Sequence, residues 1–138
     1  MNTHFINWND VPEGLWTWPN FTPKEMADRK TGALFFVPEF MGRLQRLRST
    51  LDFPLPVNSA YRTLEHDRAI GGKNVHPSGE AVDIAIWGER AYLLNRVAPG
   101  LGFTGIGVKA HGPYKGRFIH LDCVNDDAHP RPTLWGYK

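Results

Sequence analysis

The sequence predicts an α+β fold in which a small antiparallel sheet packs against helices. Segments with helical periodicity dominate the first half of the chain, and short β-branched segments dominate the second half. The 14 glycines and 11 prolines predict shaped loops between these segments. Because 138 residues suit one domain, we expect a single domain over 1–138. Residues 1–20 should wrap its surface, and residues 124–138 should form a C-terminal tail.

Four segments have the pattern of helices. Thr22 is a suitable N-cap and Pro23 suits the first helical position, which predicts a short helix there. Residues 38–51 place four apolar side chains on one helical stripe: Phe40, Leu44, Leu47 and Leu51. The segment 63–70 predicts one or two helical turns ended by a glycine pair, and 89–98 predicts a helix stopped by a Pro-Gly pair.

Strands are predicted in four places. The first half of residues 55–62 and the segment 81–86 form the first two. Residues 103–108 and 117–124 form the other two, and the segment 109–116, which contains glycine and proline, joins them as a hairpin loop.

Composition excludes several classes of function. A nucleic-acid binder usually carries a stronger and more clustered basic surplus than a net charge of +2. No apolar run approaches the roughly 18 residues that cross a membrane. Cys123 is the single cysteine, which excludes an internal disulfide and is compatible with a reducing compartment. The first residues lack a basic region followed by an apolar one, so we expect synthesis in the cytoplasm without a signal peptide.

Three tryptophans lie near the start of the chain: Trp8, Trp16 and Trp18. Such rings can form a platform for sugars. We expect them to pack against the domain instead, because bulky aromatic rings supply much of the buried area of a small core.

The stretch NVHPSGEAVDIAI, residues 74–86, contains the first candidate site. Alternation along its strand places Asp83 on a face that otherwise carries only alanine methyl groups. The larger apolar residues point to the other face: Val82, Ile84 and Ile86. His76 precedes the strand across a turn in which Pro77 restricts the backbone and Gly79 can adopt angles closed to other residues. Such a turn can fold the imidazole back toward Asp83.

The strand predicted over 117–124 supplies the second half of the site. Alternation sends His120 and Asp122 to one face and Cys123 to the other. Two histidines and one carboxylate are a usual protein ligand set of catalytic zinc, which keeps a fourth position for water. From the residues alone, the alternative is a turn histidine, a capping or salt-bridged aspartate and an unrelated strand histidine.

Three motifs follow one another along the chain: SAYRTLEHDRAIGGK at 59–73, HPSGEAVD at 76–83 and TGIGVKAHGPYKGRFIHLDC at 104–123. The first is similar to an S-G-Y-R-[ST] stretch with a later G-G. The second matches H-x-x-G-x-A-x-D, and the third is similar to a segment with G-I-G and H-x-D. In this order they resemble the M15-type zinc D-Ala-D-Ala carboxypeptidases and related peptidoglycan peptidases. The resemblance runs from about residue 20 to 123 and implies the fold shared with hedgehog domains.

The resemblance implies that Zn²⁺ is held by His76, Asp83 and His120. It also implies a catalytic and substrate-binding role for Arg62, which matches an arginine that binds a substrate carboxylate or polarises the scissile carbonyl. A guanidinium fork suits a carboxylate or an oxyanion and keeps its charge at any working pH. Without the resemblance, Arg62 would be a surface arginine at the end of a strand.

The resemblance does not settle the general base. Many family members have an acidic residue three positions before the last histidine ligand, where this chain has Arg117. Asp122 is the best local candidate for the catalytic base because it shares a strand face with His120. Its alternative role is to orient that histidine. His111 is a second candidate, for proton transfer or for binding the substrate oxyanion.

The activity implied by the resemblance is zinc-dependent hydrolysis of peptide bonds in peptidoglycan stem peptides, by a D-Ala-D-Ala carboxypeptidase or an endolysin-like enzyme. We expect a monomer that acts on the cell wall, in phage lysis or as part of a virion. A cytoplasmic dipeptidase is an alternative. The rival hypotheses are a zinc-containing binding module of the hedgehog kind and a structural component of a phage tail.

Overall fold

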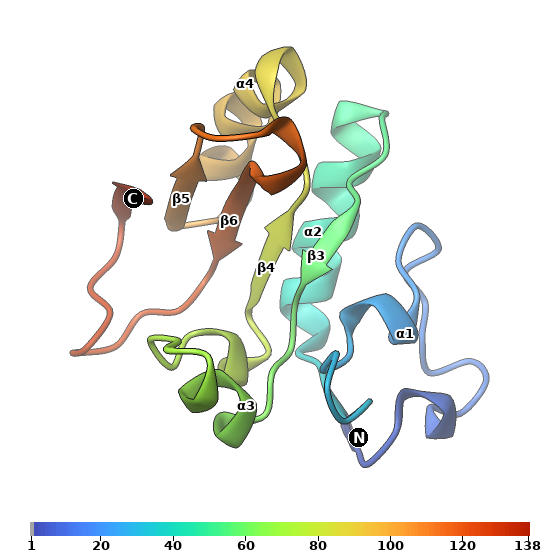
Figure 1. The fold of residues 1–138 in the computed structure, drawn as a ribbon. Helices are drawn as coiled ribbons and strands as arrows, with labels where there is room; N and C mark the ends of the chain where they lie inside the picture. Colours follow the sequence, from blue (N-terminus) through green and yellow to red (C-terminus); the bar gives the residue numbers. More distant parts are fainter. Residues whose placement is uncertain (1) are drawn as a thin grey trace.

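A five-stranded sheet forms the centre of the fold (Figure 1). The computed structural model describes residues 2–138. The strands are hydrogen-bonded in the order β3-β4-β6-β5-β7. Their bounds are β3 (Val57–Ser59), β4 (Ala81–Ile84), β5 (Gly105–Lys109), β6 (Phe118–Asp122) and β7 (Thr133–Gly136). Helices accompany the sheet, so the predicted α+β class is confirmed.

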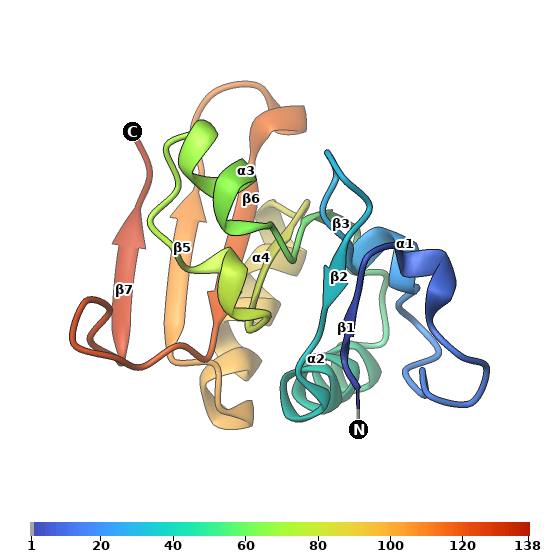
Figure 2. The same cartoon turned by 90° about the horizontal axis from the view of Figure 1, so that it is seen from below.

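β7 is a strand that the sequence analysis did not predict. The pairs β3-β4, β4-β6 and β5-β6 are antiparallel, as expected, whereas β5 and β7 are parallel, with Gly107 opposite Trp135. After β6 the chain passes the end of β5 and returns along its free edge, as Figure 2 shows. The tail expected over 124–138 therefore contains a strand, and the sheet is mixed.

Helices form at the four predicted places: α1 (Pro23–Met26), α2 (Pro38–Leu51), α3 (Leu64–Ala69) and α4 (Gly88–Val97). Thr22 caps α1, because its Oγ1 accepts a hydrogen bond from the backbone N–H of Glu25 at 3.2 Å. Thr63 caps α3 in the same way, through the backbone N–H of His66. In Figure 2, α3 lies in front of the sheet and α4 behind it.

The hydrophobic core fills the space between the sheet, α2 and α4. The β4 and β6 residues on this face are at most 2% exposed: Val82, Ile84, Ile119 and Leu121. They form one buried cluster with three residues of the predicted helical stripe: Phe40, Leu44 and Leu47. Leu51, the fourth, is half-buried against it. Because strand side chains alternate, this packing leaves Asp83 and His120 on the opposite face of the sheet.

The residues that precede α1 pack against the same core. β1 (His4–Phe5) pairs with β2 (Leu34–Phe35) in a separate two-stranded sheet. The ring of Trp16 lies edge-on to Trp18 and to Phe36, with centroids 5.0 and 5.1 Å apart. Its Nε1–H donates to the carbonyl of Phe21 at 2.6 Å. The prediction that these tryptophans pack against the domain is therefore confirmed.

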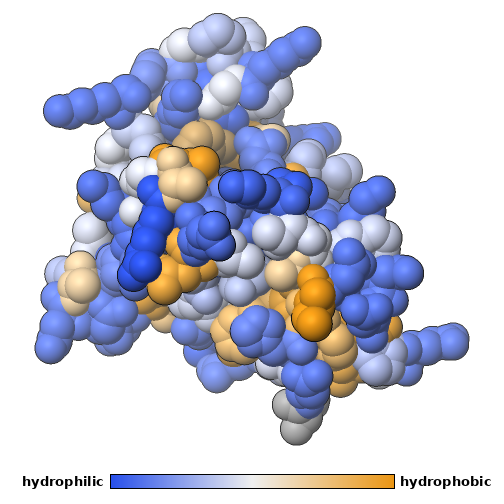
Figure 3. All heavy atoms as spheres, turned by 60° about the horizontal axis from the view of Figure 1, so that its bottom comes forward, coloured by the Kyte–Doolittle hydropathy of each residue, from blue (hydrophilic) through white to orange (hydrophobic). Residues whose placement is uncertain are grey.

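Hydrophobic residues at the surface are scattered. On the face that Figure 3 shows, they form small separate patches among hydrophilic residues, an arrangement that is normal for protein surfaces. Within residues 2–138, no helix combines the length and the apolar character that spanning a membrane requires.

The buried carboxylate of Asp28 ties the N-terminal part of the chain to the start of α3. Its Oδ1 accepts hydrogen bonds from the backbone N–H groups of Lys30 and Thr31, at 2.7 and 2.9 Å. Its Oδ2 accepts from the backbone N–H of Thr63 at 2.7 Å and from the Nδ1 of His66 at 2.9 Å. Burial raises the pKa of Asp28, but these hydrogen bonds outweigh it and lower that pKa to about 2.

We predict that Asp28→Asn lowers the free energy of unfolding at neutral pH by about 2 kcal/mol, because the amide is neutral and offers one acceptor oxygen instead of two. The wild-type advantage is complete above the unfolded-state pKa of 3.8 and disappears as the pH falls through the folded-state pKa of about 2. Urea denaturation at several pH values between about 2 and 7 measures this difference. Parallel pH profiles for the two proteins would contradict the prediction.

Candidate metal centre

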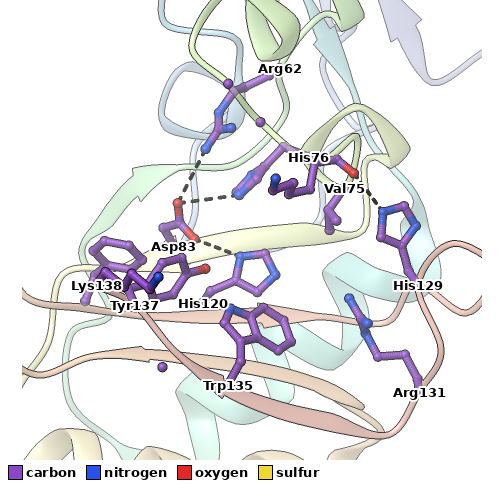
Figure 4. Close-up of a pocket in the computed structure, with 15 residues that line it drawn as sticks. Arg62, Val75, His76, Asp83, His120, His129, Arg131, Trp135, Tyr137 and Lys138 are labelled. Carbon is purple, nitrogen blue, oxygen red and sulfur yellow. Dashed lines mark hydrogen bonds and ion pairs between the residues drawn. The ribbon is translucent and has the colours of Figure 1, made fainter.

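Asp83 and His120 face each other across β4 and β6. They are direct partners in the strand register, and the Nδ1 of His120 lies 2.9 Å from the Oδ1 of Asp83. The Nε2 of His76 lies 3.4 Å from the other carboxylate oxygen, Oδ2. Each residue offers one ligand atom, and these atoms all lie within 4.8 Å of one another (Figure 4). The fold thus brings together the three residues that the resemblance implies as ligands.

A 3-10 turn over His76–Ser78 places His76 above the sheet. Gly79 ends this turn with a φ of 73°, in the left-handed region that glycine adopts without strain. The Nδ1 of His76 lies 2.6 Å from the carbonyl oxygen of Ala60, which accepts its proton. The Nε2 is therefore the nitrogen that faces Asp83 and is available to a metal ion.

The orientation of His120 is set by a carboxylate behind it. The Nε2 of His120 lies 2.7 Å from the Oδ2 of Asp122, so its N–H donates to that oxygen, and Nδ1 is the nitrogen that faces Asp83 and is available to a metal ion. Asp122 is fully buried. Histidines that bind metals usually donate their other N–H to a carboxylate or a carbonyl. Both imidazoles therefore have the arrangement that a metal requires, so the residues present fit a bound metal ion.

Arg131 holds the Asp122 carboxylate from the other side. Its Nε donates to Oδ1 and its Nη2 donates to Oδ2, each at 2.8 Å. Two parallel hydrogen bonds of this kind fix a carboxylate in one orientation. The guanidinium lies over the ring of Trp135, with 5.2 Å to the centroid. The sequence analysis did not identify Arg131 or Trp135.

The carboxylates at the centre stay ionised. Burial raises the pKa of Asp83, but hydrogen bonds to His120 and His76 outweigh it and hold that pKa well below its usual range. Burial also raises the pKa of Asp122, and the contacts with His120 and Arg131 reverse the shift in the same way. For His120, burial lowers the pKa, but the hydrogen bonds to Asp122 and Asp83 outweigh burial, so the pKa of His120 is raised. Asp83 therefore offers an ionised carboxylate to a cation.

Arg62 approaches the centre from the end of β3. Its Nη2 lies 3.6 Å from the Oδ2 of Asp83. Its Nη1 is 2.6 Å from the Oδ1 of the buried Asp67, and its Nε is 3.1 Å from the Oγ of Ser59. A Cβ at Gly72 would collide with the Asp67 carboxylate, which explains the second glycine of the pair after α3. Arg62 is thus anchored beside the candidate ligands.

A cavity of about 600 Å³ opens above the three candidate ligands. Arg62 and Arg131 line it from different sides, as Figure 4 shows, and Lys73 also lines it. Within the described part of the chain, Asp83 is the only acidic residue that lines this cavity. The cavity therefore combines a floor of candidate metal ligands with cationic walls.

Two of the predicted functional residues do not line the cavity. Asp122 is buried behind His120, with both carboxylate oxygens hydrogen-bonded. His111 is exposed in the loop that precedes β6, and its Nε2 lies 3.0 Å from the carbonyl oxygen of Tyr137. His129, for which the sequence offered no motif, does line the cavity, and its Nε2 lies 2.7 Å from the Lys73 carbonyl oxygen.

Three aromatic rings form one wall of the cavity: Phe118, Trp135 and Tyr137. The centroids of Phe118 and Tyr137 are 5.0 Å apart, and the Trp135 ring lies 5.2 Å from His120. The period-two spacing of Trp135 and Tyr137 was the one available signal of a strand in this segment.

The G-I-G motif makes room for this wall. A Cβ at Gly107 would lie 2.5 Å from the Nε1 of Trp135, and a Cβ at Gly105 would collide with the Asp122 carboxylate. Glycine at both positions of β5 therefore leaves space for the side chains that complete the centre.

Comparison with known proteins identifies the family. The sequence model of the family described as Peptidase M15 matches residues 19–122, which is more than half of the chain. The chain therefore belongs to the M15 peptidase family, and the resemblance drawn from the three motifs is confirmed. A search of curated proteins found no match to the chain. The family match ends at Asp122, before Arg131, Trp135 and Tyr137.

We predict that Gly107→Ala lowers the free energy of unfolding by about 1–3 kcal/mol, because the added methyl group forces the Trp135 and Tyr137 rings to move. Gly42→Ala is the matched control. A Cβ there meets no atom within 4 Å, and alanine in the middle of α2 should raise stability by about 0.5–1 kcal/mol. Urea denaturation of both variants tests this, and equal effects would contradict it.

Proposed function

We propose that the protein is a zinc-dependent metallopeptidase that hydrolyses peptide bonds in peptidoglycan stem peptides, as a D-Ala-D-Ala carboxypeptidase or an endolysin-like enzyme. The observation that carries the proposal is the convergence of His76, Asp83 and His120 below a cavity, in a chain that belongs to the M15 peptidase family. We further propose that it works as a monomer on the cell wall, in phage lysis or as part of a virion.

His76, Asp83 and His120 would hold the metal through two imidazole nitrogens and one carboxylate oxygen. This set matches catalytic zinc, which takes three protein ligands and leaves one position open. A Zn²⁺ ion bound there supplies Lewis acidity, which polarises a peptide carbonyl and activates water for attack. The hydrogen bonds from His76 to Ala60 and from His120 to Asp122 hold both imidazoles ready for this role.

In this proposal Arg62 binds and orients the substrate. Its guanidinium reaches the cavity 3.6 Å from Asp83 and can donate to a substrate carboxylate or to the oxygen on which negative charge develops. Asp67 and Ser59 already hold two of its nitrogens, so little side-chain freedom is lost when the substrate binds. The aromatic wall offers an apolar surface to the rest of the peptide.

For Asp122 we favour the role of orienting His120 over that of general base. Both of its oxygens are hydrogen-bonded, and it does not line the cavity. Accepting a proton from the attacking water would require its contacts with Arg131 to break. The exposed His111 supports the end of β7 through the carbonyl of Tyr137, and a direct contact with substrate would require this loop to move.

One observation favours the rival hypothesis of a zinc-containing module without catalysis, of the hedgehog or phage-tail kind. Arg117 occupies the position at which many family members have an acid. Its Nε donates to the Gly112 carbonyl at 3.0 Å, and its guanidinium lies 4.3 Å from the ring centroid of Tyr114. Arg117 therefore supports the loop between β5 and β6 and contributes no acid to the cavity.

We predict that the purified protein cleaves peptidoglycan fragments, that a chelator abolishes the cleavage and that added Zn²⁺ restores it. Mass spectrometry of the products identifies the bond that is cut. His76→Ala should lose zinc. Its activity should fall by more than the roughly 10- to 100-fold that is lost when a residue supporting a metal ligand is replaced. His4→Ala, at an exposed histidine of β1, is the matched control and should retain both.

A zinc-loaded wild-type protein that leaves all fragments intact would reject the peptidase function and favour the module without catalysis. Cleavage that persists in the metal-free protein would reject the role of the metal.

We predict that Arg62→Lys lowers kcat/KM about 100-fold, because lysine keeps the charge but loses the fork that fixes substrate geometry. Zinc content, measured by metal analysis, should stay at the wild-type level. Arg96→Lys on the exposed side of α4 provides the control. An unchanged kcat/KM in Arg62→Lys would show that Arg62 does not contact the substrate.

A further inference from the structure

Arg131 lies in the segment between β6 and β7, outside the residues that match the family. Its side chain is 6% exposed, which is unusual for an arginine. Its polar contacts are with the Asp122 carboxylate and, through Nη1, with the carbonyl of Pro130 at 3.0 Å. Arg131 is therefore built into the centre although it lies beyond the residues that the family model matches.

The Asp122 carboxylate depends on this contact. It is fully buried, and a buried carboxylate without a cationic partner is strongly disfavoured. The Nε and Nη2 of Arg131 each donate at 2.8 Å, one to each oxygen, which fixes the plane of the carboxylate. Oδ2 is also the atom that accepts the Nε2–H of His120, at 2.7 Å.

The orientation of Asp122 in turn fixes the imidazole of His120. With Nε2–H donating to Asp122, Nδ1 is directed at Asp83, 2.9 Å away, and is the atom that can bind a metal ion. A carboxylate free to rotate would no longer hold the ring in this orientation. Arg131 can therefore affect metal binding without touching the metal.

The surroundings of Arg131 hold it in place. Its guanidinium lies over Trp135 at 5.2 Å from the ring centroid, and the same ring lies 5.2 Å from His120. A Cβ at Gly105 would lie 2.5 Å from the Nε of Arg131. Trp135 of β7 thus packs against the Arg131 side chain, and Gly105 of β5 leaves room for it.

We propose that Arg131 is a positioning residue of the metal centre, which locks Asp122 against His120 and so presents the Nδ1 of His120 to the metal. This inference rests on the proposed metal-dependent function and extends the centre beyond the residues shared with the family. It predicts that metal affinity depends on a residue that binds neither metal nor substrate.

The first experiment measures zinc affinity by competition with a chromophoric chelator, using metal-free protein. Arg131→Met should weaken zinc binding about 10- to 100-fold, the range found when a partner of a ligand histidine is lost. Arg131→Lys keeps a charge but not the fork, and should lose less than about tenfold. Arg90→Met is the matched control, because Arg90 also lies over a ring, Phe53 at 4.9 Å, but away from the cavity.

The second experiment distinguishes positioning from general stabilisation. Nitrogen-15 NMR of the zinc-loaded protein reports which nitrogen of His120 carries the proton; this should be Nε2 alone in wild type and a mixture of Nε2 and Nδ1 in Arg131→Met. Thermal unfolding shows whether each variant is folded at the temperature of the zinc titration. If Arg131→Met does not fold, Arg131→Lys carries the test with the same two measurements.

Wild-type zinc affinity and an unchanged His120 tautomer in a folded Arg131 variant would overturn the inference, even if its melting temperature falls. A wild-type protein that binds zinc but cleaves nothing rejects the peptidase function and leaves this inference standing. A wild-type protein that binds no zinc overturns both.

Discussion

The pairing of Asp83 with His120 across β4 and β6 is the contact on which the metal centre depends. A shift of one strand by one residue in this register would turn its side chain, Asp83 or His120, into the core, because strand side chains alternate between faces. The apolar residues between them prevent the shift, since Val82, Ile84 and Leu121 are completely buried on the other face. The hydrophobic core therefore determines the geometry of the polar centre, although the two lie on opposite sides of the sheet.

Buried carboxylates fix the side chains and backbone around this centre. Asp67 anchors Arg62, Asp122 orients His120, and Asp28 fixes the start of α3. Each is compensated by several hydrogen bonds, as the burial of a charge requires. The side of the cavity that carries Arg62 is thus held in place by a carboxylate, Asp67, that does not line the cavity. This arrangement explains why so many polar side chains can be buried in a small domain.

Much of the fold and the centre could be predicted from local patterns. The α+β class, the helix caps and the orientation of His76, Asp83 and His120 follow from periodicity, turn residues and alternation within a few residues. β7 and Arg131 could not be found in this way. The strand is short and pairs parallel with β5, which is distant in the sequence. The role of Arg131 becomes evident only in the fold, where its side chain contacts Asp122. The roles of Asp122 and His111 were left open by the sequence because burial cannot be read from residue type alone.

The parallel pairing of β7 with β5 has a consequence for how much of the chain the centre requires. All three candidate ligands precede β7 in the chain and lie on or beside the antiparallel strands. Trp135 and Arg131 follow them, and β7 docks on the edge of the sheet that β5 offers. A chain clipped before Arg131 would thus contain the ligands without their supporting side chains. Completion of the centre therefore depends on the segment 131–136 as well as on the ligands.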